Sequence, residues 1–210
     1  MQFKMGINER KEREKAELRS LILDGAMEVF LEAGFENTSI RKVAERIEYS
    51  PGTIYVYFKD KDEILHELHH IAFDQLMAVM QQTEAHADPL DQLYAIGENY
   101  ITFALQNPQL YELMFVLAAP MKAIHPDCEW EEGFRTYQYF KEVVSRTLDA
   151  GRLKPVDPEV LCVTLWAAVH GLVTLYLRER FQMIPAEQIE PLIRHCLRQL
   201  LQQYVVNQDN

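Results

Sequence analysis

Residues 38–58 read TSIRKVAERIEYSPGTIYVYF, and this stretch decides how the N-terminal part of the chain folds. Thr38 belongs to a residue type that caps helices, and Ser50 followed by Pro51 is a strong signal for the start of another helix. Between these two signals, apolar residues recur with the spacing of a buried helical face: Ile40, Val43, Ala44 and Ile47. The stretch therefore predicts two short helices joined by a tight turn.

A longer amphipathic helix is expected before this pair. Residues 10–33 carry apolar side chains on one face and charges on the other, and Gly34 is of the type that ends a helix. Three helices in this order form a helix-turn-helix domain, in which the last short helix enters the major groove of DNA. The sequence therefore predicts a DNA-binding domain over residues 1–60.

Side chains near the start of the second short helix suit close contact with a duplex. Ser50, Gly52 and Thr53 are small enough to let the backbone approach DNA, and Tyr55 and Tyr57 offer hydroxyl groups to phosphates or base edges. An alternative remains open, because two tyrosines at this spacing are also compatible with simple core aromatics.

Three basic residues add to this prediction. Arg41 is of the type that binds guanine through two hydrogen bonds, and Lys42 and Lys61 are placed to meet phosphates. The formal net charge of −11 does not exclude a nucleic-acid partner, because the charge is unevenly distributed. Residues 1–61 hold 11 basic and 11 acidic residues, whereas residues 62–210 hold 10 and 21 and so carry the whole negative charge.

The stretch TSIRKVAERIEYSPGTIYVYFKDKDEIL resembles the DNA-binding motif of the tetracycline-repressor (TetR) family of bacterial regulators, over roughly residues 15–65. Farther on, residues 98–115 and 165–175 resemble the C-terminal domain of a subgroup named for a Trp…His-Gly signature, here Trp166, His170 and Gly171. The resemblance implies a homodimer that binds a palindromic operator in double-stranded DNA and a small molecule in its C-terminal domains.

The resemblance also implies roles for individual residues. The positions expected near bases are Arg41, Pro51, Gly52, Thr53 and Tyr55, and those expected near phosphates are Lys42, Ser50, Tyr57 and Lys61. One residue departs from the family pattern, since Glu48 occupies the turn where family members usually have glycine. A residue with a side chain in a left-handed conformation costs roughly 1 kcal/mol. A carboxylate beside DNA is also repelled by phosphate, so Glu48 is expected to alter the turn or weaken binding.

The remaining sequence indicates an all-α protein with a ligand-binding and dimerisation domain over residues 61–210. A helix is expected from about residue 60 to 83, and no strand pattern or repeat interrupts those that follow. These later helices are predicted at 88–105, 108–117, 130–150, 157–179 and 186–206. Residues 161–177 are apolar nearly all round, which we interpret as a helix buried on several sides rather than a membrane span.

Residues 66–70 read HELHH, a match to the H-E-x-x-H signature of zinc peptidases. A zinc peptidase needs a third protein ligand, and the extended signature is absent because positions 73 and 76 are Phe and Leu. We therefore expect no enzyme activity, no metal and no cofactor, with a zinc-dependent hydrolase as the weakest alternative.

Cys128, Cys162 and Cys196 are expected to be reduced, buried thiols. The N-terminus lacks a signal-peptide pattern, which favours a cytoplasmic protein.

Residues 94–140 contain ten of the 22 aromatic residues, about twice an even share. Core packing accounts for this equally well, but an apolar pocket for a small effector is the functional interpretation. The candidate ligand-binding residues are Tyr100, Phe103, Tyr111, Met114, Phe115, Trp130, Phe134, Tyr137, Trp166 and His170. A DNA-binding dimer without any effector remains the main alternative.

The last two predicted helices carry apolar faces suited to pairing with a second copy. The predicted contacts are Leu165, Ala168, Leu172, Leu175 and Tyr176 on one, and Ile189, Ile193, Cys196, Leu200 and Tyr204 on the other. Two copies joined there would form a four-helix interface, and dimerisation is needed to place two DNA-binding domains on successive half-sites.

Overall fold

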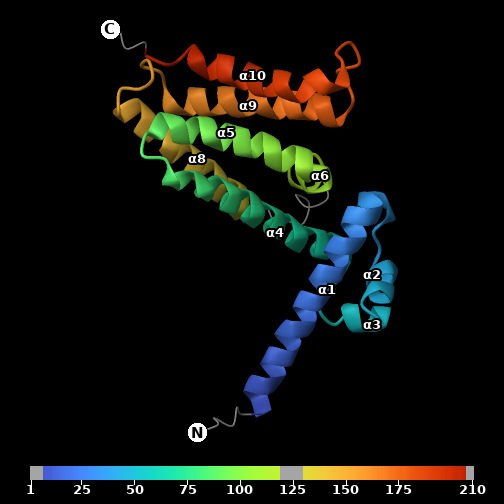
Figure 1. The fold of residues 1–210 in the computed structure, drawn as a ribbon. Coiled ribbons are helices and arrows are strands. Elements are labelled where there is room, and N and C mark those ends of the chain that lie inside the picture. The colour runs from blue at the N-terminus through green and yellow to red at the C-terminus, as the bar shows by residue number, and fades with distance from the viewer. Residues whose placement is uncertain (1–6, 119–129, 207–210) are drawn as a thin grey trace. The chain divides into compact units, whose positions relative to one another are not determined.

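The computed structural model describes residues 7–118 and 130–206, and the regular elements of these residues are helices apart from one isolated bridge between Leu153 and Val205 (Figure 1). This confirms the predicted all-α fold. In chain order the elements are α1 (Ile7–Asn37), α2 (Ile40–Arg46), α3 (Pro51–Ile54), α4 (Lys61–Gln81), the short 3-10 helix η1 (Gln82–Ala85), α5 (Pro89–Gln106), α6 (Pro108–Phe115), α8 (Glu131–Asp149), α9 (Pro158–Leu177) and α10 (Ala186–Gln202).

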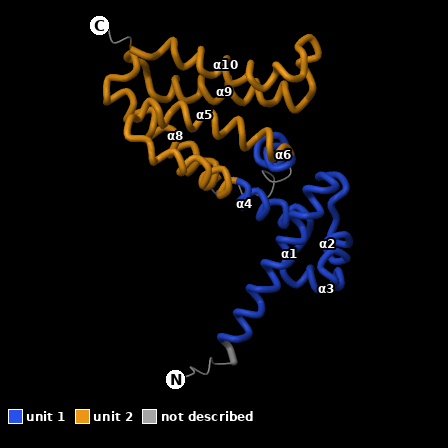
Figure 2. The backbone as a smooth tube through the Cα atoms, in the orientation of Figure 1, with its two compact units in different colours: residues 1–72, 109–128 blue, residues 73–108, 129–210 orange. Residues whose placement is uncertain are grey.

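The chain divides into two compact units, which are coloured separately in Figure 2. Unit 1 comprises Met1–Ala72 and Gln109–Cys128, and unit 2 comprises Phe73–Pro108 and Glu129–Asn210. Helices α4 and α6 therefore contribute residues to both units. The first half of α4 belongs to the same unit as α1, α2 and α3, although the sequence placed the end of the first domain at residue 60.

Unit 1 is built around close packing of α1 against α2 and of α2 against α3. A Cβ atom added to Gly25 of α1 would lie 2.3 Å from Cγ2 of Ile47, so only glycine lets the chain after α2 approach α1 this closely. The core of these helices is fully apolar and contains Ile22, Ala26, Phe30, Val43, Ala44, Ile54 and Phe58. Its tight packing holds the two short helices in place.

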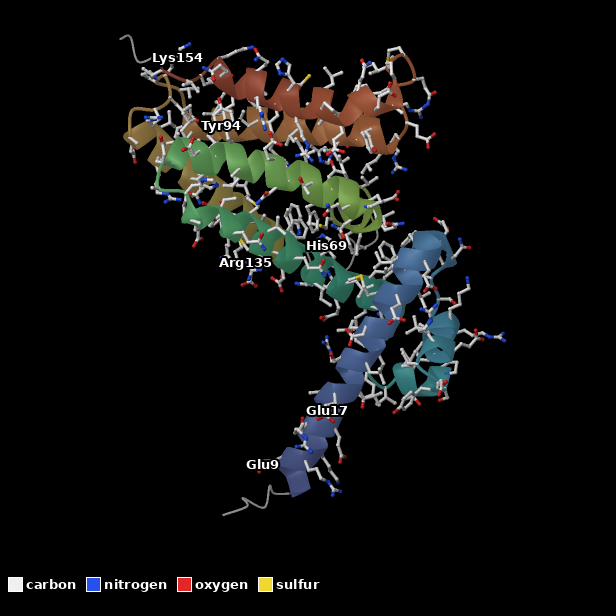
Figure 3. The ribbon with its side chains drawn as sticks, viewed as in Figure 1. Glu9, Glu17, His69, Tyr94, Arg135 and Lys154 are labelled. Atoms are coloured by element: carbon white, nitrogen blue, oxygen red, sulfur yellow. The ribbon has the colours of Figure 1, made fainter. Side chains whose placement is uncertain are left out.

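Unit 2 is a helical bundle in which α5 packs against α8, α9 and α10. Polar contacts tie α10 to α5: the two oxygens of Glu98 accept hydrogen bonds of 2.7 Å from Arg194 and from Arg198. The Tyr94 hydroxyl on α5 donates to Gln202 at 3.0 Å (Figure 3). These contacts fix the register between helices that are about a hundred residues apart in the sequence.

Three helices end in the same backbone motif, in which a residue just past the helix adopts a left-handed conformation. This residue is Glu48 after α2 (φ 59°), Gly151 after α8 (φ 66°) and Glu179 after α9 (φ 52°). In each case the amide of the next residue and the amide of the left-handed residue donate to carbonyl groups of the last helical turn. These two hydrogen bonds measure 2.9 and 3.4 Å after α2, 3.1 and 2.9 Å after α8, and 2.8 and 2.9 Å after α9. Glycine is the residue best suited to this position, and only Gly151 meets that preference.

Two of the predicted dimer contacts are wrong, because Leu165 and Ile193 are buried within unit 2 at 4% and 0% exposure. Helix α9 is apolar on nearly every face, so its sequence does not reveal which face is covered. In the described part of the chain it is also the one helix long and apolar enough to cross a membrane, with 28% of its most apolar stretch buried. Much of its apolar surface is therefore left open.

Candidate nucleic-acid interface

Helix α2 is capped by Ser39, whose hydroxyl accepts a hydrogen bond from the Lys42 amide at 3.3 Å. The prediction that Thr38 caps this helix is wrong. Thr38 is 3% exposed, and its hydroxyl instead donates to the Gly34 carbonyl at 2.9 Å, where it serves the end of α1. Serine is the better capping residue of the two, and Thr38 is in addition buried and bonded to the end of α1.

The turn between α2 and α3 confirms the expected left-handed conformation at Glu48. The Tyr49 amide donates to the Ala44 carbonyl at 2.9 Å, and the Glu48 amide donates to the Glu45 carbonyl at 3.4 Å. These bonds satisfy the last carbonyl groups of α2 and direct the chain into α3. The geometry of the turn is thus intact despite the unfavourable residue.

Helix α3 begins at Pro51, and Ser50 caps it by accepting a hydrogen bond from the Thr53 amide at 3.1 Å. The hydroxyl groups of Ser50 and Thr53 also lie 3.0 Å apart and share a hydrogen bond. Helical hydrogen bonding continues beyond α3, since the Phe58 amide donates to the Ile54 carbonyl at 3.0 Å. Ile54 and Phe58 are 0% and 1% exposed, so they define the inward face of this turn.

The opposite face of this segment is open to solvent. Successive helical residues are ~100° apart, so Gly52 and Val56 each lie about 160° around the axis from Ile54. Val56 is 75% exposed, and Tyr55 beside it is 58% exposed. Val56 was not among the predicted DNA-binding residues, although its offset of two from a buried position was a readable signal.

The three predicted cations occupy different surroundings. The Arg41 side chain is 83% exposed and its Nε lies 2.9 Å from Glu45 on the same helix, while Lys42 is exposed beside it. Lys61, in contrast, donates from Nζ to the Phe35 carbonyl at 2.9 Å and lies 4.1 Å above the Phe35 ring. The structure therefore brings Arg41 and Lys42 together on the α2 surface, whereas Lys61 supports the end of α1.

Arg46 at the end of α2 links the helix-turn-helix to α1. Its guanidinium donates to Glu28 at 2.9 Å and to both carboxylate oxygens of Glu32. The hydrogen bonds from Arg46 hold the pKa of Glu32 below its ordinary value, and Glu32 and Glu28 raise the pKa of Arg46. This bridge orients α2 on α1.

The HELHH segment lies on the part of α4 that belongs to unit 1. Its glutamate, Glu67, lies 2.7 Å from Arg19, and the Nε2 atoms of His66 and His70 are 3.0 Å apart and share a hydrogen bond. His69, labelled in Figure 3, is 0% exposed. Over residues 7–118 and 130–206, no group of three His, Cys, Asp or Glu side chains is arranged to hold a metal ion.

The candidate effector residues separate into two groups. Tyr111, Met114 and Phe115 lie on the part of α6 that belongs to unit 1, and the first two are buried. The others belong to unit 2, where Phe134 is 56% exposed and faces solvent. Trp130 packs its indole ring against the backbone of Gly133, where an added Cβ atom would meet the ring at 2.3 Å.

Four of the unit 2 residues form a continuous row, which we call the aromatic row: Tyr100, His170, Trp166 and Tyr137. The Tyr100 hydroxyl lies 3.4 Å from Nδ1 of His170, and ring centroids are 6.3 Å apart from His170 to Trp166 and 6.2 Å from Trp166 to Tyr137. Burial lowers the pKa of His170, so its imidazole is neutral at pH 7 and able both to donate and to accept a hydrogen bond.

The end of the row is polar. Tyr137 donates to Glu159 at 2.5 Å, and burial together with this hydrogen bond raises the pKa of the tyrosine. Cys162 follows Glu159 by three positions in the sequence and is buried. Burial raises the pKa of its thiol to about 11, which keeps the thiol protonated. Cys196 is half-buried rather than buried, and Cys128 lies outside the described residues.

A three-helix unit with a capped, outward-facing short helix after a tight turn defines a helix-turn-helix transcriptional regulator. The chain belongs to the TetR family: the family described as bacterial regulatory proteins, tetR family, matches residues 22–68, and the tetracyclin repressor-like C-terminal domain matches residues 93–200. The C-terminal match confirms the family but not the Trp…His-Gly subgroup, which stays a prediction.

Individual relatives agree with this assignment. The chain is 26% identical to the helix-turn-helix regulator YhgD of Bacillus subtilis, over 90% of this chain and 94% of that protein. It is 29% identical to a helix-turn-helix regulator of Haemophilus influenzae over 46% of this chain, and so spans about half, 52%, of that relative. A solved structure from Rhodococcus sp. RHA1, of unknown function, has the same fold with a TM-score of 0.75 and 21% identity, over 90% of this chain and 96% of that one.

Proposed function

We propose that this regulator binds a palindromic operator as a homodimer and is released from it by a small apolar or aromatic effector, in the cytoplasm. One observation carries the DNA-binding part of the proposal. The segment around α3 has a buried face made by Ile54 and Phe58, and its opposite face consists of Gly52 and Val56 with exposed tyrosine beside them. A surface of this kind fits the major groove and has no evident use within the chain.

The homodimer is supported by the outer face of α9. Apolar or small residues recur there every three or four positions in what we call the α9 outer stripe: Val160, Val163, Ala167, Gly171 and Leu175. Val160, Val163 and Leu175 are 59%, 48% and 43% exposed. An added Cβ atom on Gly171 would meet nothing within 4 Å, so unit 2 itself gives no reason for glycine there. A second copy packed along the stripe would cover this apolar surface through the same residues on both sides.

Dimerisation is tested with a charge in the stripe. Val163→Glu should convert the dimer to monomer in sedimentation velocity and abolish operator binding, because two buried carboxylates would face each other without partners. Gln82→Glu, which adds the same charge on exposed η1, should leave the dimer intact. A Val163→Glu protein that remains dimeric would show that α9 is not the interface.

The aromatic row is the proposed effector site. Its rings offer apolar contact, and the neutral imidazole of His170 with the Tyr100 hydroxyl offers a hydrogen-bonding pair that would orient a ligand. Release from DNA requires the effector to bind one conformation better than the other, and 1–3 kcal/mol of such coupling is typical. Helix α4 runs from unit 1 into unit 2 and is the proposed element through which the spacing of the two DNA-binding units changes.

DNA binding is tested by selecting bound duplexes from a random pool and measuring their affinity by fluorescence anisotropy. We expect a palindrome whose half-sites are about one helical turn, ~34 Å, apart. Arg41→Ala should cost about 1–3 kcal/mol of binding free energy and relax the preference at one base pair. If the pool yields no enriched sequence, the proposed function is wrong.

The effector is sought among small apolar and aromatic compounds. Trp130→Phe leaves Trp166 as the single tryptophan, so a compound that binds the row should change its fluorescence and weaken operator binding in the same concentration range. Tyr137→Phe keeps the aromatic ring of this residue and removes only its hydroxyl group, so it serves as a conservative control. If no compound changes the fluorescence of Trp166 or the melting temperature, the chain acts without an effector and the row is core packing.

A further inference from the structure

We infer that Val56 contacts the 5-methyl group of a thymine in each operator half-site and so determines part of the sequence specificity. This inference rests on the proposed DNA-binding function and adds to it the identity of one base in the half-site. It is carried by two residues that the fold of unit 1 does not require, Val56 and Gly52.

Val56 has no packing role in unit 1. It is 75% exposed, whereas the neighbouring inward residues Ile54 and Phe58 are 0% and 1% exposed. Its backbone amide donates to the Thr53 carbonyl at 3.2 Å, so it is held in a helical turn, where a branched side chain has few rotamers. Val56 follows the end of α3, and together with the exposed Tyr55 it leaves a large apolar surface uncovered in this turn, which we take to be used by an external partner.

Gly52 lies one turn before Val56 on the same outward face. An added Cβ atom there would meet only the Ser50 hydroxyl oxygen, at 3.6 Å, which is ordinary contact, and the backbone does not adopt a left-handed conformation. Alanine would fit this position and is the better helix-forming residue. The missing side chain therefore lowers the surface beside Val56 and lets an opposing surface come close.

Thymine is the base that fits an exposed valine. In the major groove each base pair presents hydrogen-bond donors and acceptors, and thymine alone adds a methyl group. The valine methyl groups have no hydrogen-bonding capacity, so they gain free energy from contact with that methyl and none from the other bases. Tyr55 and Thr53 lie on either side of Gly52 and Val56, and their hydroxyl groups would serve polar positions nearby.

The inference is tested by replacing each thymine of the selected operator with uracil, which removes only the 5-methyl group. For the wild-type protein, the exchange to uracil should matter at one thymine position. There it should lower the affinity for the operator about fourfold when made in one half-site and about fifteenfold when made in both. For Val56→Ala the same exchange should have no effect, while exchanges elsewhere should act on both proteins alike. Val116→Ala, which alters another exposed valine of unit 1, should behave as wild type.

Val56→Thr gives a second variant that keeps one methyl group and should retain part of the discrimination. Because the side chain is exposed, all three variants should keep the wild-type circular dichroism and melting temperature. If wild type and Val56→Ala respond equally to uracil at every thymine position, Val56 contacts no methyl group and the inference is overturned, although operator binding itself would stand. If no operator can be selected at all, the proposed function fails first and this inference fails with it.

Discussion

Replacing Glu48 by glycine should both stabilise the protein and strengthen its binding to DNA. Glu48 holds the left-handed position of the turn between α2 and α3, with φ 59°. Two separate costs are expected from this residue: backbone strain, since its Cβ atom crowds the following carbonyl, and the charge of its carboxylate beside the DNA-binding surface.

The strain has a definite magnitude. A left-handed residue with a Cβ atom costs about 1–2 kcal/mol, and glycine returns about 0.5–1 kcal/mol of this through its greater freedom in the unfolded chain. Glu48→Gly should therefore raise the free energy of unfolding by about 0.5–1 kcal/mol. For a chain of this length that corresponds to an increase of ~1–4 °C in melting temperature.

The protein contains its own controls for this effect. Glu179 has the same conformation and the same two backbone hydrogen bonds, but it follows α9 in unit 2. Glu179→Gly should raise the melting temperature by a similar amount without any effect on DNA. Gly151→Glu introduces the same strain after α8 and should lower the melting temperature correspondingly.

The charge is separated from the strain by Glu48→Gln, which keeps the side-chain shape and the left-handed backbone. At ~8–10 Å in water, one carboxylate repels one phosphate by about 0.4–0.5 kcal/mol, so each subunit should gain about twofold in affinity at low salt and less at 0.15 M. Calorimetry on all four variants measures the strain, and operator anisotropy on Glu48→Gly, Glu48→Gln and Glu179→Gly measures the effect on DNA binding. If Glu48→Gly leaves the melting temperature unchanged while Glu179→Gly raises it, the strain at Glu48 is relieved by a local contact and the reasoning is wrong.

Three further predictions concern charged groups. Lys61→Ala should weaken binding to all duplexes alike and flatten the salt slope by about one; it should also lower the melting temperature, unlike Lys42→Ala, because Lys61 holds the Phe35 carbonyl. At pH values above 4.5, the ordinary pKa of Glu32, Arg46→Ala should lower the melting temperature. This difference from wild type should vanish as the pH falls through the lowered pKa that Glu32 has in the folded state. His170 has a lowered pKa when folded, so the unfolded state binds its proton first and stability should fall as the pH drops below the ordinary value of 6.5. His170→Gln should remove that part of the pH dependence in urea unfolding.

Local signals in the sequence were enough to predict the helices and the turn of unit 1. Ser50 and Pro51 marked the start of α3, because caps depend on a few neighbouring residues. The left-handed conformation at Glu48 was expected instead from the resemblance to TetR regulators, which usually have glycine there. The choice between Thr38 and Ser39 as the cap depended in part on which side chain α1 buries. The burial of Thr38 belongs to tertiary packing, but the stronger capping preference of serine already favoured Ser39.

The faces of α9 illustrate what periodicity does not reveal. Since almost every residue of the helix is apolar, Leu165 and Val163 look equivalent in the sequence, yet one is 4% and the other 48% exposed. A prediction of contact surfaces therefore fails for a helix that is apolar on every face. Val56 is a different case, because its offset of two from Ile54 was readable in the sequence and was overlooked; its side chain is 75% exposed.

The charges of unit 1 bear on how an acidic chain would select one DNA sequence over others. Arg41 is paired with Glu45, and Arg46 is paired with Glu28 and Glu32.

A cation that must leave a carboxylate to reach a phosphate adds little net electrostatic attraction, so affinity for arbitrary duplexes should be low and the salt slope shallow. Selectivity then depends on groove contacts such as those proposed for Val56. Glu45→Gln, which frees Arg41, should raise the affinity for random DNA and steepen the salt slope by about one, whereas Glu36→Gln, an exposed glutamate before α2, should change the slope less. If Glu45→Gln leaves binding to random DNA unchanged, the ion pair on α2 does not restrain Arg41 and the low background must come from the acidic charge of the chain as a whole.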